Sequence, residues 1–375
     1  MSRIFVVAGE ASGDALGADL IRELKKRDPS LAVAGCGGPA MEAAGVKSVI
    51  DISGLAVFGL FDGLKAYGRV VRLVEAVVEA ADAFKPDVAV LIDSWGFTLR
   101  VAQRLRARAP GVKLVKYIGP QVWAARAGRA RTLAAAVDHL ICIHDFEVPY
   151  YAPYGLACTV AGHPAIGRMK QGDGAAFRVR HGLGDAPIAL VLPGSRRSEV
   201  RRVAPTLWRA ASLLGARIVC VAAGSVGAAV RAQAPAGAVI VPEAEKEDAF
   251  AAATVALCVS GTVTTEAALQ GAPLIVGYKL GWFTWALARG LGLYTAPFVT
   301  LLNVAAGREV APEFLQTKLK AEAIAAYAAN LIADPAARAA QVEAQNAALV
   351  KMGRGGRPAA EIAADAVLGV LSSAR

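Results

Sequence analysis

Short apolar runs alternate with amphipathic stretches along most of the chain. In the first half, the apolar runs predict strands at 3–9, 31–38, 87–93, 113–119, 138–144 and 158–164. Amphipathic stretches between them predict helices at 14–27, 64–84 and 97–108. Strands buried on both faces appear as continuous apolar runs, and strands that alternate with helices form parallel sheets. The first half therefore predicts a doubly wound α/β domain.

Residues 167–187 interrupt this alternation with glycine, proline and charged residues. Beyond them it resumes, with strands expected at 188–194, 217–224, 238–243, 255–261 and 273–279. Helices are expected near 198–214, 246–253 and 264–270, and from about 318 onward. We therefore expect Rossmann-like domains at 1–168 and 185–345, and a helix at 346–375 that returns to the N-terminal domain of this chain or of a partner. Ligand sites of such sheets lie at the carboxyl ends of the strands, so we expect both domains to face a central cleft.

Composition supports a folded chain with an anionic partner. The 375 residues are 55% hydrophobic and 19% charged, which excludes a disordered chain. Lys and Arg number 41 against 31 Asp and Glu, a net charge of +10. The basic residues are not interleaved with stacking aromatics, so we expect no nucleic acid partner. An anionic membrane surface or a phosphorylated substrate accounts better for the charge.

Two segments combine apolar side chains with basic ones, as membrane-surface segments do. In 55–72, apolar residues at i, i+3, i+4 and i+7 precede Lys and Arg; they are Val57, Leu60, Phe61 and Leu64. In 279–293, the apolar residues lie between Lys279 and Arg289; they are Trp282, Phe283, Trp285 and Leu287. Each stripe can equally be a buried helix face. The uncharged stretch 290–307 is broken by glycine and proline, which indicates an apolar loop region and not a transmembrane helix.

Polar residues follow two predicted strands of the first domain. Gly9, Gly13 and Gly17 are four apart, which is not the dinucleotide-binding spacing, yet such a turn still lets a polar ligand reach backbone amides. Ser12 or Asp14 could instead cap the following helix, whereas Glu10 directly follows the strand. Asp93 ends the apolar run 87–93 and can act as a general base toward a sugar hydroxyl or cap a loop. For His163 we expect a structural position.

Two loops of the second domain have the features of phosphate sites. Arg196 and Arg197 stand at a helix start, where positive charge opposes the helix dipole, and this favours a bound anion near Arg196. Ser260, Gly261 and Thr262 follow a buried strand, and their amides could hold a diphosphate. Glu266, one turn further, could accept hydrogen bonds from a ribose diol or simply compensate the dipole.

The segment 303–316 contains Asn303, Arg308, Glu309, Glu313 and Gln316. The last three are spaced i, i+4 and i+7, which predicts one helix face that is either solvated or lines a pocket.

Together these motifs resemble the lipid A disaccharide synthases, a family of inverting glycosyltransferases with the two-domain GT-B fold. The resemblance rests on the motifs at 8–14, 85–93, 117–124, 192–200, 260–279 and 303–316. It implies an enzyme of lipid A and lipopolysaccharide biosynthesis that joins UDP-2,3-diacylglucosamine to 2,3-diacylglucosamine 1-phosphate. The products are the β-1,6-linked disaccharide 1-phosphate and UDP. It also implies no metal and no cofactor, and a peripheral position on the cytoplasmic face of the inner membrane.

The resemblance also implies roles for individual residues. In the first domain, Asp93 would be the base that activates the acceptor 6-hydroxyl, and the loop of Glu10, Ser12 and Gly13 would position the acceptor. In the second domain, the diphosphate and ribose contacts would be Arg196, Ser260, Gly261, Thr262 and Glu266. The donor-side segment would contribute Asn303, Arg308, Glu309 and Gln316.

Two departures from the family pattern concern the shape of the acceptor pocket. Ser94, Trp95 and Gly96 stand where the family more often has proline and an acidic residue, and Ala125 stands where a second tryptophan is common. The alternatives are a UDP-sugar epimerase of the same fold, a transferase with another lipid-linked acceptor, or a nucleotide-binding membrane module without enzymatic activity.

Overall fold

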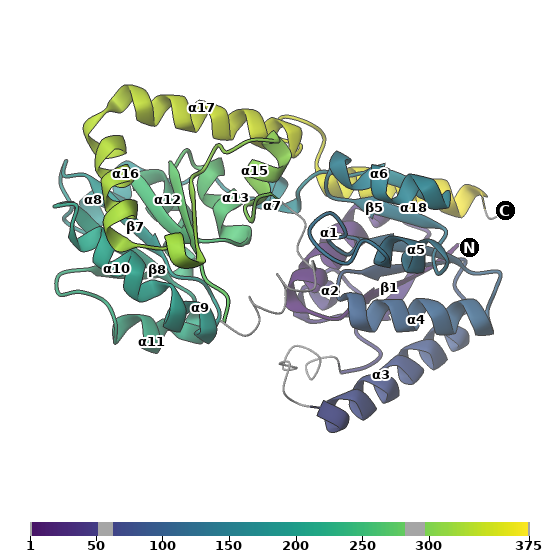
Figure 1. Ribbon diagram of the computed structural model, residues 1–375. Helices are drawn as coiled ribbons and strands as arrows, with labels where there is room; N and C mark the ends of the chain where they lie inside the picture. Colours follow the sequence, from purple (N-terminus) through teal and green to yellow (C-terminus); the bar gives the residue numbers. More distant parts are fainter. Residues whose placement is uncertain (1, 52–62, 282–296, 374–375) are drawn as a thin grey trace. The chain divides into compact units, whose positions relative to one another are not determined.

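The computed structural model describes residues 2–51, 63–281 and 297–373, apart from the side chains of 63–67 (Figure 1). The chain forms two compact units. The first contains Met1–Pro164 together with Gly356–Arg375, and the second is Ala165–Gly355.

The first unit is built on a six-stranded parallel sheet with the order β2-β1-β3-β4-β5-β6. Its strands are β1 (Arg3–Ala8), β2 (Ala32–Cys36), β3 (Val88–Ile92), β4 (Lys113–Tyr117), β5 (His139–Cys142) and β6 (Ala157–Val160). β1 lies between β2 and β3, with Ile4 opposite both Val33 and Val88. The winding direction therefore reverses between β1 and β3, which makes this the switch point of the sheet.

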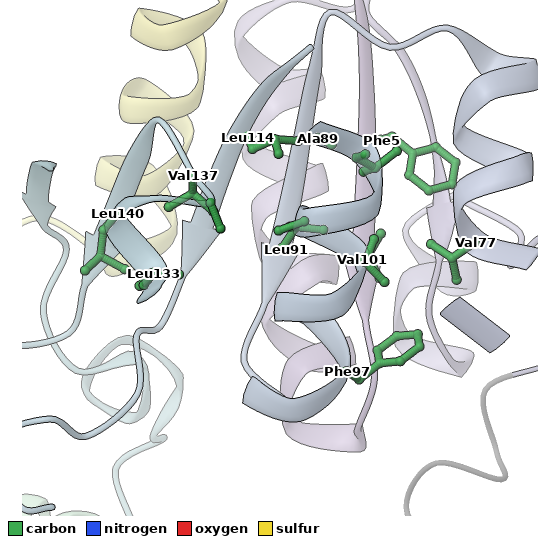
Figure 2. Close-up of a cluster of buried hydrophobic side chains, with 14 of the residues drawn as sticks. Phe5, Val77, Ala89, Leu91, Phe97, Val101, Leu114, Leu133, Val137 and Leu140 are labelled. Atoms are coloured by element: carbon green, nitrogen blue, oxygen red, sulfur yellow. The ribbon is translucent and has the colours of Figure 1, made fainter. Parts of the chain in front are cut away.

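Helices cover both faces of this sheet. One face packs against α3 (Gly63–Phe84), α4 (Trp95–Arg108), α5 (Arg129–Ala134) and α6 (Val148–Tyr151). Figure 2 shows part of this core, in which Phe5 and Leu91 of the sheet meet Val77 of α3 and Val101 of α4. The other face packs against α1 (Ala11–Arg27), α2 (Pro39–Ala43) and α18 (Ala359–Ser373). Because both faces are covered, the central strands β1 and β3 consist almost entirely of buried apolar residues.

The helix α18 is distant in sequence from the rest of the first unit but packs on α1 (Figure 1). Its buried residues Ala364 and Val367 join the core beneath α1. The Arg27 guanidinium donates to the Asp365 carboxylate over 2.7 Å, which links the two helices at the surface.

The second unit contains another six-stranded parallel sheet, with the order β12-β11-β10-β7-β8-β9. Its strands are β7 (Ile188–Leu192), β8 (Arg217–Ala222), β9 (Val239–Pro242), β10 (Val255–Val259), β11 (Leu274–Tyr278) and β12 (Glu313–Leu315). One face packs against α8 (Gly174–Arg180), α12 (Lys246–Ala252), α13 (Thr262–Leu269), α15 (Leu301–Ala306) and α17 (Pro335–Lys351). The other packs against α9 (Arg197–Arg202), α10 (Ala204–Ser212), α11 (Gly227–Arg231) and α16 (Ala321–Ala333). The switch point of this sheet lies between β7 and β10.

The two doubly wound sheets confirm the α/β class expected from the sequence, and each predicted strand is present. Two expectations are wrong. The helix expected at 198–214 divides into α9 and α10, with Pro205 in the first turn of α10. Glu309, Glu313 and Gln316 do not share a helix face, because Glu313 begins β12 opposite Val276. Pro312 favours an extended backbone before it, and this ends the helical spacing.

Both candidate membrane stripes fall largely outside the described residues. These include Val57, Leu60 and Phe61 in the first stripe and all four apolar residues of the second. Leu64 lies in α3, but its side chain is outside the described part. Among the helices that are described, none is long and apolar enough to cross a bilayer.

Candidate functional site

Four of the predicted site residues, one after each of four strands, lie at the carboxyl edges of the two sheets. In the first unit, β1 leads into Glu10 and β3 leads into Asp93, and these strands flank the switch point. In the second unit, β7 leads toward Arg196 and β10 leads into Ser260, again on either side of the switch point. Ligands of open α/β sheets bind at such points.

The loop between β1 and α1 presents its polar side chains to solvent. Glu10 and Ser12 are exposed, and neither side chain hydrogen-bonds to any residue that the structure describes. Gly9 lies against the loop after β3, since a Cβ at this position would come within 3.0 Å of the Ser94 Oγ. The loops of Glu10 and Asp93 are therefore close neighbours at the switch point.

Asp14 has a structural function that differs from capping its own helix. Its carboxylate accepts hydrogen bonds from the backbone amides of Gly38, Ala40 and Met41, at 2.7, 2.9 and 3.0 Å. The carboxylate is buried, and from α1 it satisfies the first backbone amides of α2. Asp14 therefore fixes α1 to α2, and Glu10 and Ser12 are the exposed polar residues of this loop.

Asp93 and Ser94 both have left-handed backbone conformations, with φ of +46° and +42°. Non-glycine residues adopt this region at a cost, and such strained residues cluster at active sites and ligand-binding segments. The Thr98 hydroxyl donates to the Asp93 carbonyl over 2.6 Å, and the Asp93 amide donates to the Tyr117 carbonyl over 2.9 Å. The backbone of Asp93 is thus held by groups on α4 and β4.

Lys116 on β4 also supports the loop that contains Asp93, and our sequence analysis did not predict this. It is buried in β4, and its ammonium donates to the Asp93 carbonyl and, over 2.7 Å, to the Thr98 hydroxyl. Burial lowers the pKa of Lys116 to about 7, although the Asp93 charge acts to raise it. The available signal was a lysine inside an otherwise apolar run, where an unpaired charge is rarely buried.

Lys116 should give the protein a measurable pH dependence of stability. Its pKa is about 7 in the folded chain, against about 10.4 when unfolded. Between these values the unfolded state binds one more proton, so the free energy of unfolding rises with pH, by up to about 1.4 kcal/mol per pH unit. Lys116→Met should remove this rise in urea unfolding between pH 7 and 9.5. Lys113→Met, on the same strand, should retain it, and parallel curves for wild type and Lys116→Met would contradict the assignment.

Arg196 precedes α9 and already has an acidic partner. Its guanidinium donates to the Glu199 carboxylate over 2.9 Å, and its side chain is 77% exposed. Glu199 lies in the first turn of α9 and compensates the helix dipole. The dipole argument for a bound anion is therefore wrong as stated, because it overlooked this carboxylate. Arg196 remains a candidate for a phosphate contact, because it is exposed and follows β7.

The residues after β10 form the start of α13. Gly261 and Thr262 are exposed, and the first turn of α13 contains no acidic residue. The Ser260 hydroxyl donates to the Val299 carbonyl over 2.8 Å. Glu266 forms an ion pair of 3.0 Å with Lys246 of α12, and both side chains are about four-fifths buried. A helix start of this kind attracts an anion, and the ion pair provides a carboxylate one turn away.

Asn303, which the sequence suggests as a donor-side contact, is bonded within its own unit. It is completely buried, and its amide group donates to the Ala311 carbonyl at 2.7 Å and to the Glu313 carboxylate at 2.9 Å. Its side-chain oxygen accepts from the Val310 and Ala311 amides. Glu313 also accepts from the Val299 and Thr300 amides, so the two residues hold the start of α15 to β12.

The other residues of this segment do not lie together. Arg308 and Glu309 follow the carboxyl end of α15, about 9 Å along the helix from its start near Thr300. Gln316, with φ of +53°, follows the carboxyl end of β12. Gln316 is therefore at the edge that carries Ser260, whereas Arg308 and Glu309 are separated from that edge by α15.

His163 is buried after β6, and its ring lies 5.8 Å from the ring of His144. His144 stacks on Phe146 with ring centroids 4.8 Å apart. Burial and the neighbouring His163 lower the pKa of His144 to about 3. Both rings are buried and packed at this edge of the sheet, so neither offers an exposed acid or base.

Comparison with known proteins places these features in a family. A family model described as lipid-A-disaccharide synthetase matches residues 4–367. The lipid-A-disaccharide synthase of Ruegeria pomeroyi is 39% identical, over 98% of this chain and 95% of its own. The one from Paramagnetospirillum magneticum is 38% identical, over 97% of this chain and 96% of its own.

Solved structures show the same fold at low sequence identity. A putative UDP-N-acetylglucosamine 2-epimerase from Listeria monocytogenes matches with a TM-score of 0.65 and 14% identity, over 99% of this chain and 96% of that one. CalG4, the calicheamicin glycosyltransferase, matches with a TM-score of 0.60 and 18% identity, over 99% and 98% of the two chains. At these identities the likeness concerns the fold alone.

Proposed function

The chain belongs to the lipid-A-disaccharide synthase family, and from this we propose that it is an inverting glycosyltransferase of the GT-B fold. It transfers the diacylglucosamine of UDP-2,3-diacylglucosamine to the 6-hydroxyl of 2,3-diacylglucosamine 1-phosphate. The products are the β-1,6-linked disaccharide 1-phosphate and UDP. The observation that carries the proposal is the family match along residues 4–367. The carboxylates at one switch point and the anion-attracting helix start at the other support it.

Asp93 is the proposed general base. The acceptor oxygen must lose its proton as it attacks the anomeric carbon, and a carboxylate within hydrogen-bond reach accepts that proton. The Thr98 and Lys116 side chains bind the Asp93 carbonyl and leave its carboxylate available. Glu10, exposed on the adjoining loop, and the neighbouring Ser12 and Gly13 are proposed to position the acceptor.

The residues after β7 and β10 are the proposed site for the UDP part of the donor. The leaving diphosphate gains negative charge as the glycosidic bond breaks, and preorganised donors stabilise that charge. Arg196 and the amides of Ser260, Gly261 and Thr262 would supply such donors, and Glu266 would accept from the ribose hydroxyls. Gln316 is proposed as a further donor contact, because it lies at the same edge of the sheet. No step of this scheme uses a metal or a cofactor.

A diacylated substrate also requires access to lipid, and we propose that the stripe of Val57, Leu60, Phe61 and Leu64 contacts an anionic membrane surface. The expected location is the cytoplasmic face of the inner membrane. Changing Val57, Leu60 and Phe61 together to Ser should weaken binding to phosphatidylglycerol vesicles by at least about tenfold, because each buried apolar side chain contributes about 1.5–3 kcal/mol. Val179→Ser and Leu213→Ser, at exposed positions of the second unit, serve as controls. A folded triple variant that binds as wild type would contradict the contact, and an unfolded one would assign the stripe to the core.

The proposed activity is tested by incubating the protein with UDP-2,3-diacylglucosamine, with and without the acceptor, and following products by mass spectrometry. We expect the disaccharide 1-phosphate and UDP only when both substrates are present. A UDP-sugar epimerase would convert the donor alone, and a nucleotide-binding membrane module would produce neither product. A transferase for another acceptor would hydrolyse or retain the donor without forming this disaccharide.

A further inference from the structure

Two arginines beside the Asp93 loop lack a counterion. Arg126 and Arg129 lie in the segment after β4, the strand that pairs with β3. Neither guanidinium forms an ion pair or hydrogen bond with any residue in the described part of the chain. Three other arginines near this sheet are paired: Arg104 and Arg108 with Glu75, and Arg106 with Asp138.

The Arg129 guanidinium lies over the ring of Trp95, 5.2 Å from its centroid. Trp95 is two residues after Asp93 and begins α4. The contact therefore places Arg129 beside the loop that carries the proposed base. Stacking on an aromatic face fixes the plane of the guanidinium and leaves its N–H groups at the edge, where they can bind an oxyanion.

Charge is unbalanced at this point. Arg129 is partly buried, and burial together with the nearby charge of Arg126 lowers its pKa from the ordinary value. Two like charges disfavour each other, and the effect is stronger where one of them is partly removed from water, as Arg129 is, whereas Arg126 is exposed. An anion bound between them would remove this penalty, and two arginines match the geometry of a phosphate better than lysines would.

We propose that Arg126 and Arg129 bind the anomeric phosphate of the acceptor, a sugar 1-phosphate, while Asp93 faces its 6-hydroxyl. This inference rests on the proposed function. The two groups belong to one pyranose ring, so their binding sites must lie within the length of one sugar. The contact of Arg129 with Trp95, two residues after Asp93, supports this proximity. The pair thus selects a phosphorylated acceptor and sets its orientation toward the base.

The test compares Arg126→Gln and Arg129→Gln with wild type on two acceptors, 2,3-diacylglucosamine with and without its 1-phosphate. A hydrogen bond to a charged group contributes about 1.5–3 kcal/mol, which corresponds to a factor of about 10–100. We expect each variant to lower the kcat/KM preference for the phosphorylated acceptor by that factor, mainly through KM. Arg131→Gln, an exposed arginine of the same segment, should keep the wild-type preference. Thermal unfolding establishes that each variant is folded.

Three results would overturn the assignment. The first is an unchanged preference in folded Arg126→Gln and Arg129→Gln. The second is an unchanged preference with reduced binding to phosphatidylglycerol vesicles, since the two arginines would then face lipid headgroups. If wild type forms no disaccharide, the proposed function fails by itself, and calorimetry with the two acceptors then tests the arginines directly. The third result is an equal loss of affinity for both acceptors in the variants, which would exclude a phosphate site.

Discussion

Asp93→Asn should lower the turnover of disaccharide formation by about 10²–10⁴-fold, the contribution typical of a general base. Asparagine is the sharper substitution because, like aspartate, it tolerates the left-handed backbone observed at this position. The neutral amide cannot accept the proton of the acceptor hydroxyl, although its size and backbone are preserved. Alanine would remove the carboxylate as well, but it would add backbone strain to the chemical effect.

The measurement is kcat with both substrates saturating, together with the affinity for UDP by calorimetry. UDP affinity should survive, because the proposed UDP site consists of residues that follow β7 and β10 in the other unit. Asp185→Asn, an exposed aspartate of that unit, should retain wild-type turnover. Normal turnover of folded Asp93→Asn would remove this residue from the position of base.

Asn303→Ala should reduce the free energy of unfolding of the second unit by about 2–4 kcal/mol, because it leaves buried amides and a carbonyl without partners. The cost is large because the wild-type side chain is completely buried and bonded on both sides. Urea unfolding measures the loss. Asn330→Ala, at an exposed position of α16, should stay within about 0.5 kcal/mol of wild type.

The two interpretations of Asn303 predict different results. A structural residue shifts the unfolding midpoint, and UDP affinity measured well below that midpoint changes little. A direct donor contact would lower UDP affinity and leave the midpoint in place. The second pattern would contradict the assignment made from the structure.

The sequence predicts the strands well because burial on both faces leaves an apolar run that needs no tertiary information. β3 and β10 are examples in which every residue is buried. β12 was missed because it has only three residues, all partly buried. In addition, Glu309, Glu313 and Gln316 have the i, i+4 and i+7 spacing that is typical of a helix face. The strand that pairs with β12, β11, is distant in sequence, so the local pattern contains no trace of the pairing.

The positions of Glu10, Asp93 and Ser260 at the carboxyl edges of the sheets were predictable, because each follows a strand. The contacts of a side chain were not predictable where its hydrogen-bond partner is distant in sequence or buried in the core. From the sequence, Asn303 looks like a residue that contacts a ligand, yet its amide group donates to the Ala311 carbonyl and the Glu313 carboxylate. Lys116 and Arg129 show the converse, because their importance comes from the Asp93 loop that the sheet brings beside them.

The packing of α18 on α1 also bears on how the protein is made. The second unit is one uninterrupted stretch, whereas the first consists of two pieces separated by 165–355. A ribosome therefore delivers the whole of the second unit before the residues that cover α1 have been synthesised. Until then, the apolar groove that receives Ala364 and Val367 remains open. The unit translated first is thus the one completed later, because its last helix is synthesised after the whole of the second unit.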